Sequence, residues 1–169
     1  MNYVREETVI ALNNLLKQCF QMNSFSDNIA YSLDVDFNCN IATKIYHEKW
    51  AHKFPEFADE LSDFMSKLNI RPVRGMLDSN DKIYSSSCID EVFNDNLAAI
   101  HQFRQEVINA IQVAEENGDR EVVIFLEDFW MNKLNYLKQA QIWAKKTQEY
   151  INDIAAFDKD FPRFTNIID

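Results

Sequence analysis

The chain contains very few of the residues that turn a polypeptide back on itself. Its 169 residues include 2 glycines and 3 prolines. A sheet-rich fold needs a turn about every eight to twelve residues, and Gly, Pro and Asn-Gly supply most of those turns. Hydrophobic residues nevertheless make up 47% of the chain, which is enough material for a sizeable core. The sequence therefore predicts an all-α protein.

Apolar residues recur every three or four positions in four long stretches, which predicts four helices over residues 3–33, 40–69, 89–116 and 119–151. Pro55 lies inside the second stretch and is expected to kink it, because proline removes a backbone donor. Gly118 and Asp119 separate the last two stretches, as a helix C-cap and the next N-cap.

The connections predict how these helices are joined. Two turns are short, but about 17 residues with proline, glycine and three consecutive serines lie between the second and third helices. A simple up-and-down bundle does not need such a connection, whereas a bundle with one crossover does. We therefore expect residues 1–152 to form an antiparallel four-helix bundle with one long crossover. Residues 153–169 are expected to form a weakly structured C-terminal tail.

Charge and cysteine content narrow the classes of partner. Lys plus Arg number 17 and Asp plus Glu 27, so the formal charge is 17 − 27 = −10. A polyanion repels nucleic acid, and no uncharged apolar run approaches the roughly 18 residues of a membrane span. The charged first residues do not suggest a signal peptide. Cys19, Cys39 and Cys88 fit neither a disulfide framework nor a zinc site, so we expect a cytoplasmic protein without nucleic-acid or membrane partners.

Three short motifs, at residues 56–61, 69–73 and 117–132, resemble motifs of ferritins and of the smaller Dps-type miniferritins. Residues 56–61 read Glu-Phe-Ala-Asp-Glu-Leu, which resembles Glu-His-Ala-Glu-Lys-Leu in the ferritin second helix. Residues 69–73, Asn-Ile-Arg-Pro-Val, are similar to the Gly-Gly-Lys-Pro-Val that follows this helix in miniferritins. Residues 117–119, followed by 125–127 and 129–132, are similar to the start of the ferritin fourth helix. The resemblance implies a ferritin-like bundle that self-associates into a dimer or shell and oxidises and stores iron.

The iron centre inside the ferritin bundle is predicted to be absent. Such a centre needs carboxylates and imidazoles, including Glu-x-x-His on the second helix, and this chain has no Glu-x-x-His. The resemblance instead places only apolar residues at the internal ligand positions, namely Phe20, Phe54, Phe57, Ile100 and Leu134. We expect these side chains to form ordinary core.

Miniferritins bind iron between subunits through His-x3-Asp-x10-Asp-x3-Glu on the second helix. The same spacing here reads Lys44-x3-Glu48-x10-Asp59-x3-Asp63. At about 100° per residue, three carboxylates and one imidazole fall within about 60° of one another, opposite the apolar face: Glu48, His52, Asp59 and Asp63. The resemblance implies that Asp59 and Asp63 are primary oxygen ligands to iron. It makes Glu48 a third or bridging carboxylate and His52 the nitrogen donor.

The departures from the miniferritin pattern leave two functions open. Lys44 replaces the first imidazole, and Tyr31 lies near where the first helix supplies another. His47 and His52 have the geometry to substitute, but Lys44 has the charge to neutralise the carboxylates, and a polar stripe opposite an apolar face is typical of a solvated helix surface. One function is an iron-binding protein of iron storage and oxidative-stress protection, with any ferroxidase site at a subunit interface. The alternative is a degenerate relative without metal, acting as a structural or interaction subunit.

Overall fold

The computed structural model describes residues 3–77, 87–150 and 153–169. Its elements follow in chain order: α1 (Glu6–Val35), α2 (Asn40–Tyr46), the π-helical turn η1 (His47–Ala51), α3 (Lys53–Lys67), α4 (Ile89–Glu116), α5 (Arg120–Met131), α6 (Leu134–Glu149), α7 (Ile154–Asp160) and the 3₁₀ turn η2 (Phe161–Phe164). No β-strand occurs in these three ranges, so the all-α prediction is confirmed. Among the described helices, none has both the length and the apolar character needed to cross a membrane.

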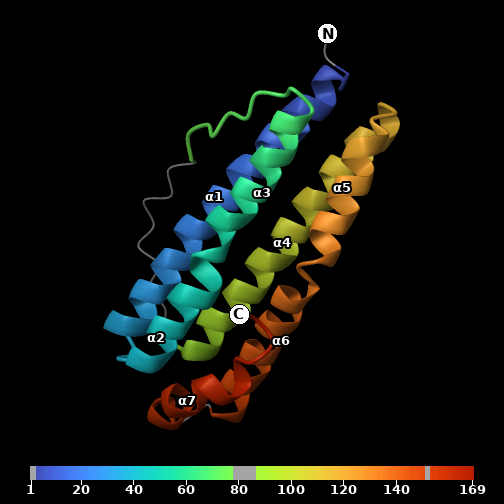
Figure 1. Ribbon diagram of the computed structural model, residues 1–169. Helices are drawn as coiled ribbons and strands as arrows, with labels where there is room; N and C mark the ends of the chain where they lie inside the picture. The colour runs from blue at the N-terminus through green and yellow to red at the C-terminus, as the bar shows by residue number, and fades with distance from the viewer. Residues whose placement is uncertain (1–2, 78–86, 151–152) are drawn as a thin grey trace.

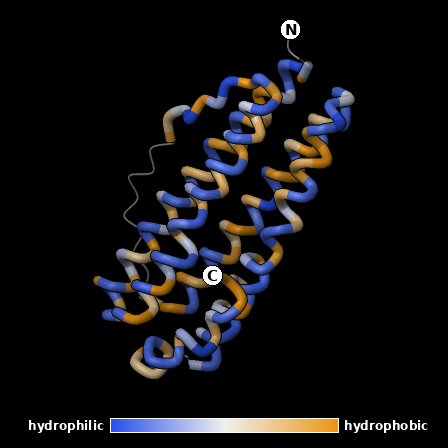
Figure 2. Tube along the Cα trace, in the orientation of Figure 1, coloured by the Kyte–Doolittle hydropathy of each residue, from blue (hydrophilic) through white to orange (hydrophobic). Residues whose placement is uncertain are grey.

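The long helices lie side by side along a common direction (Figure 1). α1 packs against α3 and α4, and α4 also packs against α5 and α6. Hydrophobic and hydrophilic segments alternate along each helix (Figure 2), as expected for helices that bury one face. The largest fully buried side chains include several aromatic rings, among them Trp50, Phe54, Phe93, Phe103 and Trp143. The core is therefore an aromatic layer enclosed between amphipathic helices.

The C-terminal tail is ordered and belongs to the core, so the prediction that it is weakly structured is wrong. Figure 1 shows α7 beside the lower ends of α2 and α6. Phe161 is fully buried and stacks on Trp143 with ring centroids 5.3 Å apart. The Asp158 carboxylate accepts a hydrogen bond of 2.7 Å from the Ala42 backbone N–H, near the start of α2. Burial of aromatic rings orders this segment. Its apolar residues do not repeat over enough helical turns for the sequence to predict that order.

The predicted fourth helix is divided into α5 and α6, which are separated by Asn132 and Lys133. At this break the Lys133 side chain turns into the protein and donates a hydrogen bond of 3.0 Å to the Phe129 carbonyl. A lysine stem is apolar, so its burial is favourable once the ammonium has acceptors. The repeat of apolar residues therefore continues through residues 132 and 133 in the sequence, although the helix is interrupted there.

Asp119 stabilises a different helix from the one expected. Its side chain makes no capping hydrogen bond to α5. It accepts hydrogen bonds from the Thr8 hydroxyl and from the Arg5 backbone N–H at the start of α1. The carboxylate thus satisfies donors at the positive end of α1, as a capping side chain does.

Candidate metal centre

A single π-helical turn brings two histidines together. The His52 N–H donates to the His47 carbonyl over 3.1 Å, five residues back along the chain. Side chains five residues apart on an α-helix point about 140° away from each other. A turn closed by an i to i+5 hydrogen bond instead stacks them on one side. The His47 and His52 rings accordingly lie with their centroids 4.1 Å apart.

Pro55 and Asn23 accompany this turn. Because proline has no N–H, Pro55 cannot donate to the carbonyl of Ala51 four residues earlier, as an α-helical residue would. The Asn23 side-chain amide, from α1, donates to that carbonyl over 2.9 Å. The distortion expected at Pro55 is therefore found one turn ahead of it, where the π-helical turn separates α2 from α3.

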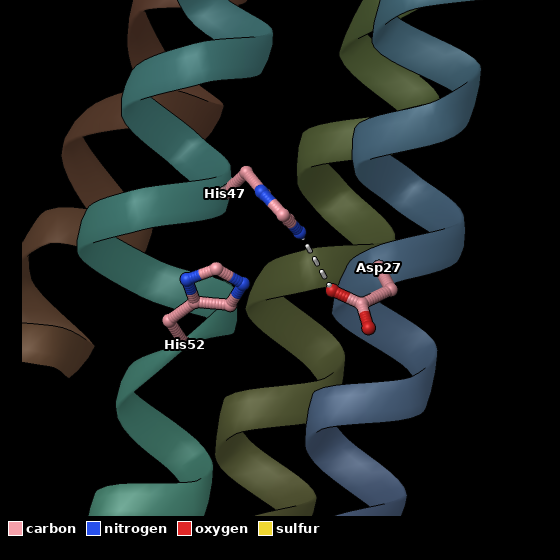
Figure 3. Close-up of side chains that lie close together, drawn as sticks. All are labelled: Asp27, His47 and His52. Carbon is pink, nitrogen blue, oxygen red and sulfur yellow. Dashed lines mark ion pairs between the residues drawn. The ribbon is translucent and has the colours of Figure 1, made fainter.

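Asp27 on α1 faces the histidine pair. Its Oδ1 atom lies 3.3 Å from His47 Nε2, and the side chains are 27% and 37% exposed respectively. Figure 3 shows Asp27 and His47 pointing toward each other from neighbouring helices, with His52 beside them. Asp27 Oδ1 is itself buried and, apart from this ion pair with His47, has no hydrogen-bond partner. A buried carboxylate oxygen without a hydrogen bond is costly unless a cation neutralises it.

These three side chains have the composition of a metal centre. One ligand atom from each of Asp27, His47 and His52 lies within 4.8 Å of the other two. In the described parts of the chain, no other group of three His, Cys, Asp or Glu residues meets this criterion. Two imidazoles and one carboxylate bind zinc or ferrous iron in proteins. Two ligands on one tetrahedral ion with bonds of about 2.0 Å are about 3.3 Å apart, which matches the separation of Asp27 Oδ1 and His47 Nε2.

Of the four predicted metal ligands, the structure brings one into this group. Glu48, His52, Asp59 and Asp63 are all exposed, and His52 alone approaches other ligand atoms in this way. The uniform 100° per residue that placed Glu48 on the face of Asp59 and Asp63 is wrong, because the π-helical turn changes the angular register between them. An iron site that these residues share with another subunit stays a prediction.

The structure buries only some of the apolar residues that the resemblance places at the internal iron-ligand positions of ferritins. Phe54, Phe57 and Ile100 are buried, as expected. Leu134 is 40% exposed, so the prediction that it fills the core is wrong. Its neighbour Lys133 occupies the interior instead, because the chain breaks between α5 and α6.

Sequence reasoning considered His47 and His52 as ligands but missed Asp27. The available signal was its isolation, because Asp27 is the one charged residue between Lys17 and Asp34. Charged side chains are rarely buried unless they are paired with another group, so an isolated charge in a largely uncharged stretch indicates a partner.

No protein-family model matches the chain, and no curated protein matches its sequence. The Asp27, His47 and His52 side chains, and the packing that holds them, are therefore the features of the chain that bear on its function.

Proposed function

We propose that the chain is an iron-binding protein that holds ferrous iron at Asp27, His47 and His52. The observation that carries this proposal is the buried Asp27 Oδ1, which has no hydrogen-bond partner apart from its ion pair with His47 Nε2, 3.3 Å away. A divalent ion between them would neutralise the carboxylate and use the imidazole nitrogen as its second ligand. With three protein ligands the ion keeps open positions, as in metal sites that exchange ligands.

Iron is preferred to zinc on the strength of the ferritin resemblance, which also assigns the chain to iron storage and oxidative-stress protection. The net charge of the chain, −10, favours the approach of cations. Iron is then the cargo of the protein. Asp27 supplies a negative oxygen donor, and His47 and His52 supply neutral nitrogen donors that the π-helical turn holds on one side of the helix.

A ferritin-like arrangement is part of the same proposal. We take α1, α2 with α3, α4, and α5 with α6 as the four rods of a bundle. In Figure 1 α3 ends and α4 begins at opposite ends of the molecule, which supports a long crossover between these two helices. We also propose self-association into a dimer or shell. Light scattering tests this directly, since a dimer has twice the mass of the 19.9 kDa chain and the shells that the resemblance implies contain 12 or 24 chains.

A cytoplasmic location is consistent with the cysteines. Cys19 and Cys39 are buried and Cys88 is exposed, and none of the three forms a disulfide in the structure. Free thiols persist in a reducing compartment.

The proposal is tested by anaerobic calorimetric titration with ferrous iron. We expect saturable binding by the wild-type protein and its loss in Asp27→Asn and His47→Gln. The matched controls are Asp59→Asn and Asp63→Asn, which change the exposed stripe on α3 and should keep wild-type binding. If only these controls lose binding, the iron lies in the predicted subunit-interface site. A wild-type protein without saturable heat excludes iron binding.

The alternative, a structural or interaction subunit without metal, is favoured by one observation. Phe54, Phe57 and Ile100 are buried, and the resemblance places them where ferritins have internal iron ligands. The melting temperature in the presence of a chelator and of ferrous iron distinguishes the two functions. Ligand binding raises stability by mass action, so an iron-binding protein melts higher with iron, whereas a metal-free scaffold does not respond.

A further inference from the structure

We infer that Asn23 is a positioning residue for the histidine pair, and this inference rests on the proposed metal site. Asn23 does not belong to the ligand group. Its amide donates to the carbonyl of Ala51, the last residue of the π-helical turn, over 2.9 Å. This contact joins α1 to the turn that places His47 beside His52.

The Ala51 carbonyl needs this donor. Trp50 and Ala51 are fully buried, so the end of the turn has no access to water. A buried backbone carbonyl without a partner is strongly disfavoured. The usual α-helical donor would be the N–H of residue 55, and proline has none. Asn23 therefore replaces the hydrogen bond that Pro55 removes.

Asn23 and the carboxylate ligand Asp27 lie on the same face of α1. Asn23 and Asp27 are four residues apart, so their side chains leave the helix on one side, one turn from each other. Asn23 fixes the turn from its C-terminal end, while Asp27 faces His47 at its N-terminal end. Without the amide, the buried Ala51 carbonyl has no donor, because an α-helical turn would still lack an N–H at residue 55. The π-helical turn is then no longer fixed to α1, and any loss of its winding would point His47 and His52 apart.

The experiment measures binding of Co²⁺, added alone, by its absorption spectrum and by competition with a chelator. We expect Asn23→Ala to weaken binding by about 10- to 100-fold, the usual effect of removing a group that orients metal ligands. Asn23→Leu, which keeps the size and branching of the side chain but removes its N–H donor, should weaken Co²⁺ binding to the same extent as Asn23→Ala. Asn14→Ala is the matched control, since Asn14 is an exposed residue of the same helix. Circular dichroism and the melting temperature establish that each variant is folded.

Rescue separates positioning from general stability. Pro55→Ala restores an N–H at residue 55 that can serve the Ala51 carbonyl, so Asn23→Ala should cost less affinity in the Pro55→Ala background than in the wild type. An equal loss in both backgrounds would overturn the inference, because Asn23 would then act by some route other than this carbonyl.

Hydrogen exchange tests the inference without metal. The His52 amide is held by the His47 carbonyl in the π-helical turn. We expect it to exchange at least about tenfold faster in Asn23→Ala, and to regain protection in the double variant with Pro55→Ala. Unchanged exchange together with unchanged Co²⁺ affinity would refute a positioning role. If the wild type binds no Co²⁺, the proposed function fails, while His52 exchange still decides the role of Asn23.

Discussion

Lys133 Nζ lies 2.8 Å from Glu60 Oε2, with the lysine side chain 4% exposed and the glutamate side chain 42% exposed. The ammonium also lies 3.6 Å from the centre of the Phe129 ring and 4.6 Å from that of Phe57. Burial lowers the pKa of Lys133, and the hydrogen bond to Glu60 partly offsets this. A cation is thus held at the edge of the aromatic core, where two ring faces and one carboxylate stabilise it.

This relationship predicts unequal effects of removing its two partners. Glu60→Gln leaves the Lys133 ammonium in desolvated surroundings without an anion, and should lower the free energy of unfolding by about 1–2 kcal/mol. Lys133→Met leaves Glu60 in contact with water and places an apolar chain among aromatic rings, so the cost should be below about 1 kcal/mol. Urea unfolding at pH 7 measures both. A larger cost for Lys133→Met than for Glu60→Gln would contradict this interpretation.

The C-terminal segment should contribute to global stability. Phe161 is fully buried and stacks on Trp143. Phe161→Ala should therefore cost about 3–5 kcal/mol through lost burial and the cavity that it leaves. Arg163→Ala is the control in the same segment, because its side chain is 79% exposed, and it should cost less than about 0.5 kcal/mol. Equal denaturation midpoints for the two variants would mean that the segment does not stabilise the helical core.

Alkaline pH should destabilise the fold. Burial raises the pKa of the Cys19 and Cys39 thiols from 9.0 to about 12 and that of Tyr136 from 10.0 to about 12. Between about pH 9 and 12 the unfolded chain loses these protons while the native protein retains them, so stability is complete below pH 9 and falls as pH rises. Lys133 has the opposite sign, because its lowered pKa makes stability rise with pH below 10.5. Hydrogen bonds to Glu149 and to Asp160 also raise the pKa of Lys146 and of Tyr150. Among the described residues, groups with a raised pKa therefore outnumber Lys133, and stability should fall overall.

The measurement is the free energy of unfolding at pH 8, 9, 10 and 11. Cys19→Ala should show a smaller decrease over this range than the wild type, since one of the buried thiols is gone. Cys88→Ala is the control, because Cys88 is exposed. A wild-type stability that rises steadily from pH 9 to 11 would show that these thiols do not remain protonated in the native protein.

The sequence predicted helices well where the apolar period is uninterrupted. α4 spans Ile89–Glu116, the same range that the repeat of apolar residues in the sequence predicts. Prediction failed where one local event changes the path of the chain. The π-helical turn at His47–Ala51 leaves the apolar spacing nearly unchanged, because Trp50 inside the turn and Phe54 just after it are both buried. The break before Leu134 is equally invisible in the sequence, since no proline or glycine marks it.

The candidate site was predictable only within one helix. Spacing along residues 40–69 identified His52 as a ligand, and the same segment contains His47. Asp27 comes from α1, and its approach to His47 depends on how α1 packs against the turn, which periodicity does not reveal. The C-terminal aromatic residues were missed for the same reason, since Phe161 is ordered by a tertiary contact with Trp143.

Anomalous diffraction at the iron edge, from crystals of the wild-type protein soaked anaerobically with ferrous iron, locates the metal directly. We predict one strong peak per chain within bonding distance of Asp27 Oδ1 and of ring nitrogens of His47 and His52, and no such peak in Asp27→Asn crystals. A peak beside Asp59 and Asp63 instead, or no peak in the wild type, would contradict the proposed site.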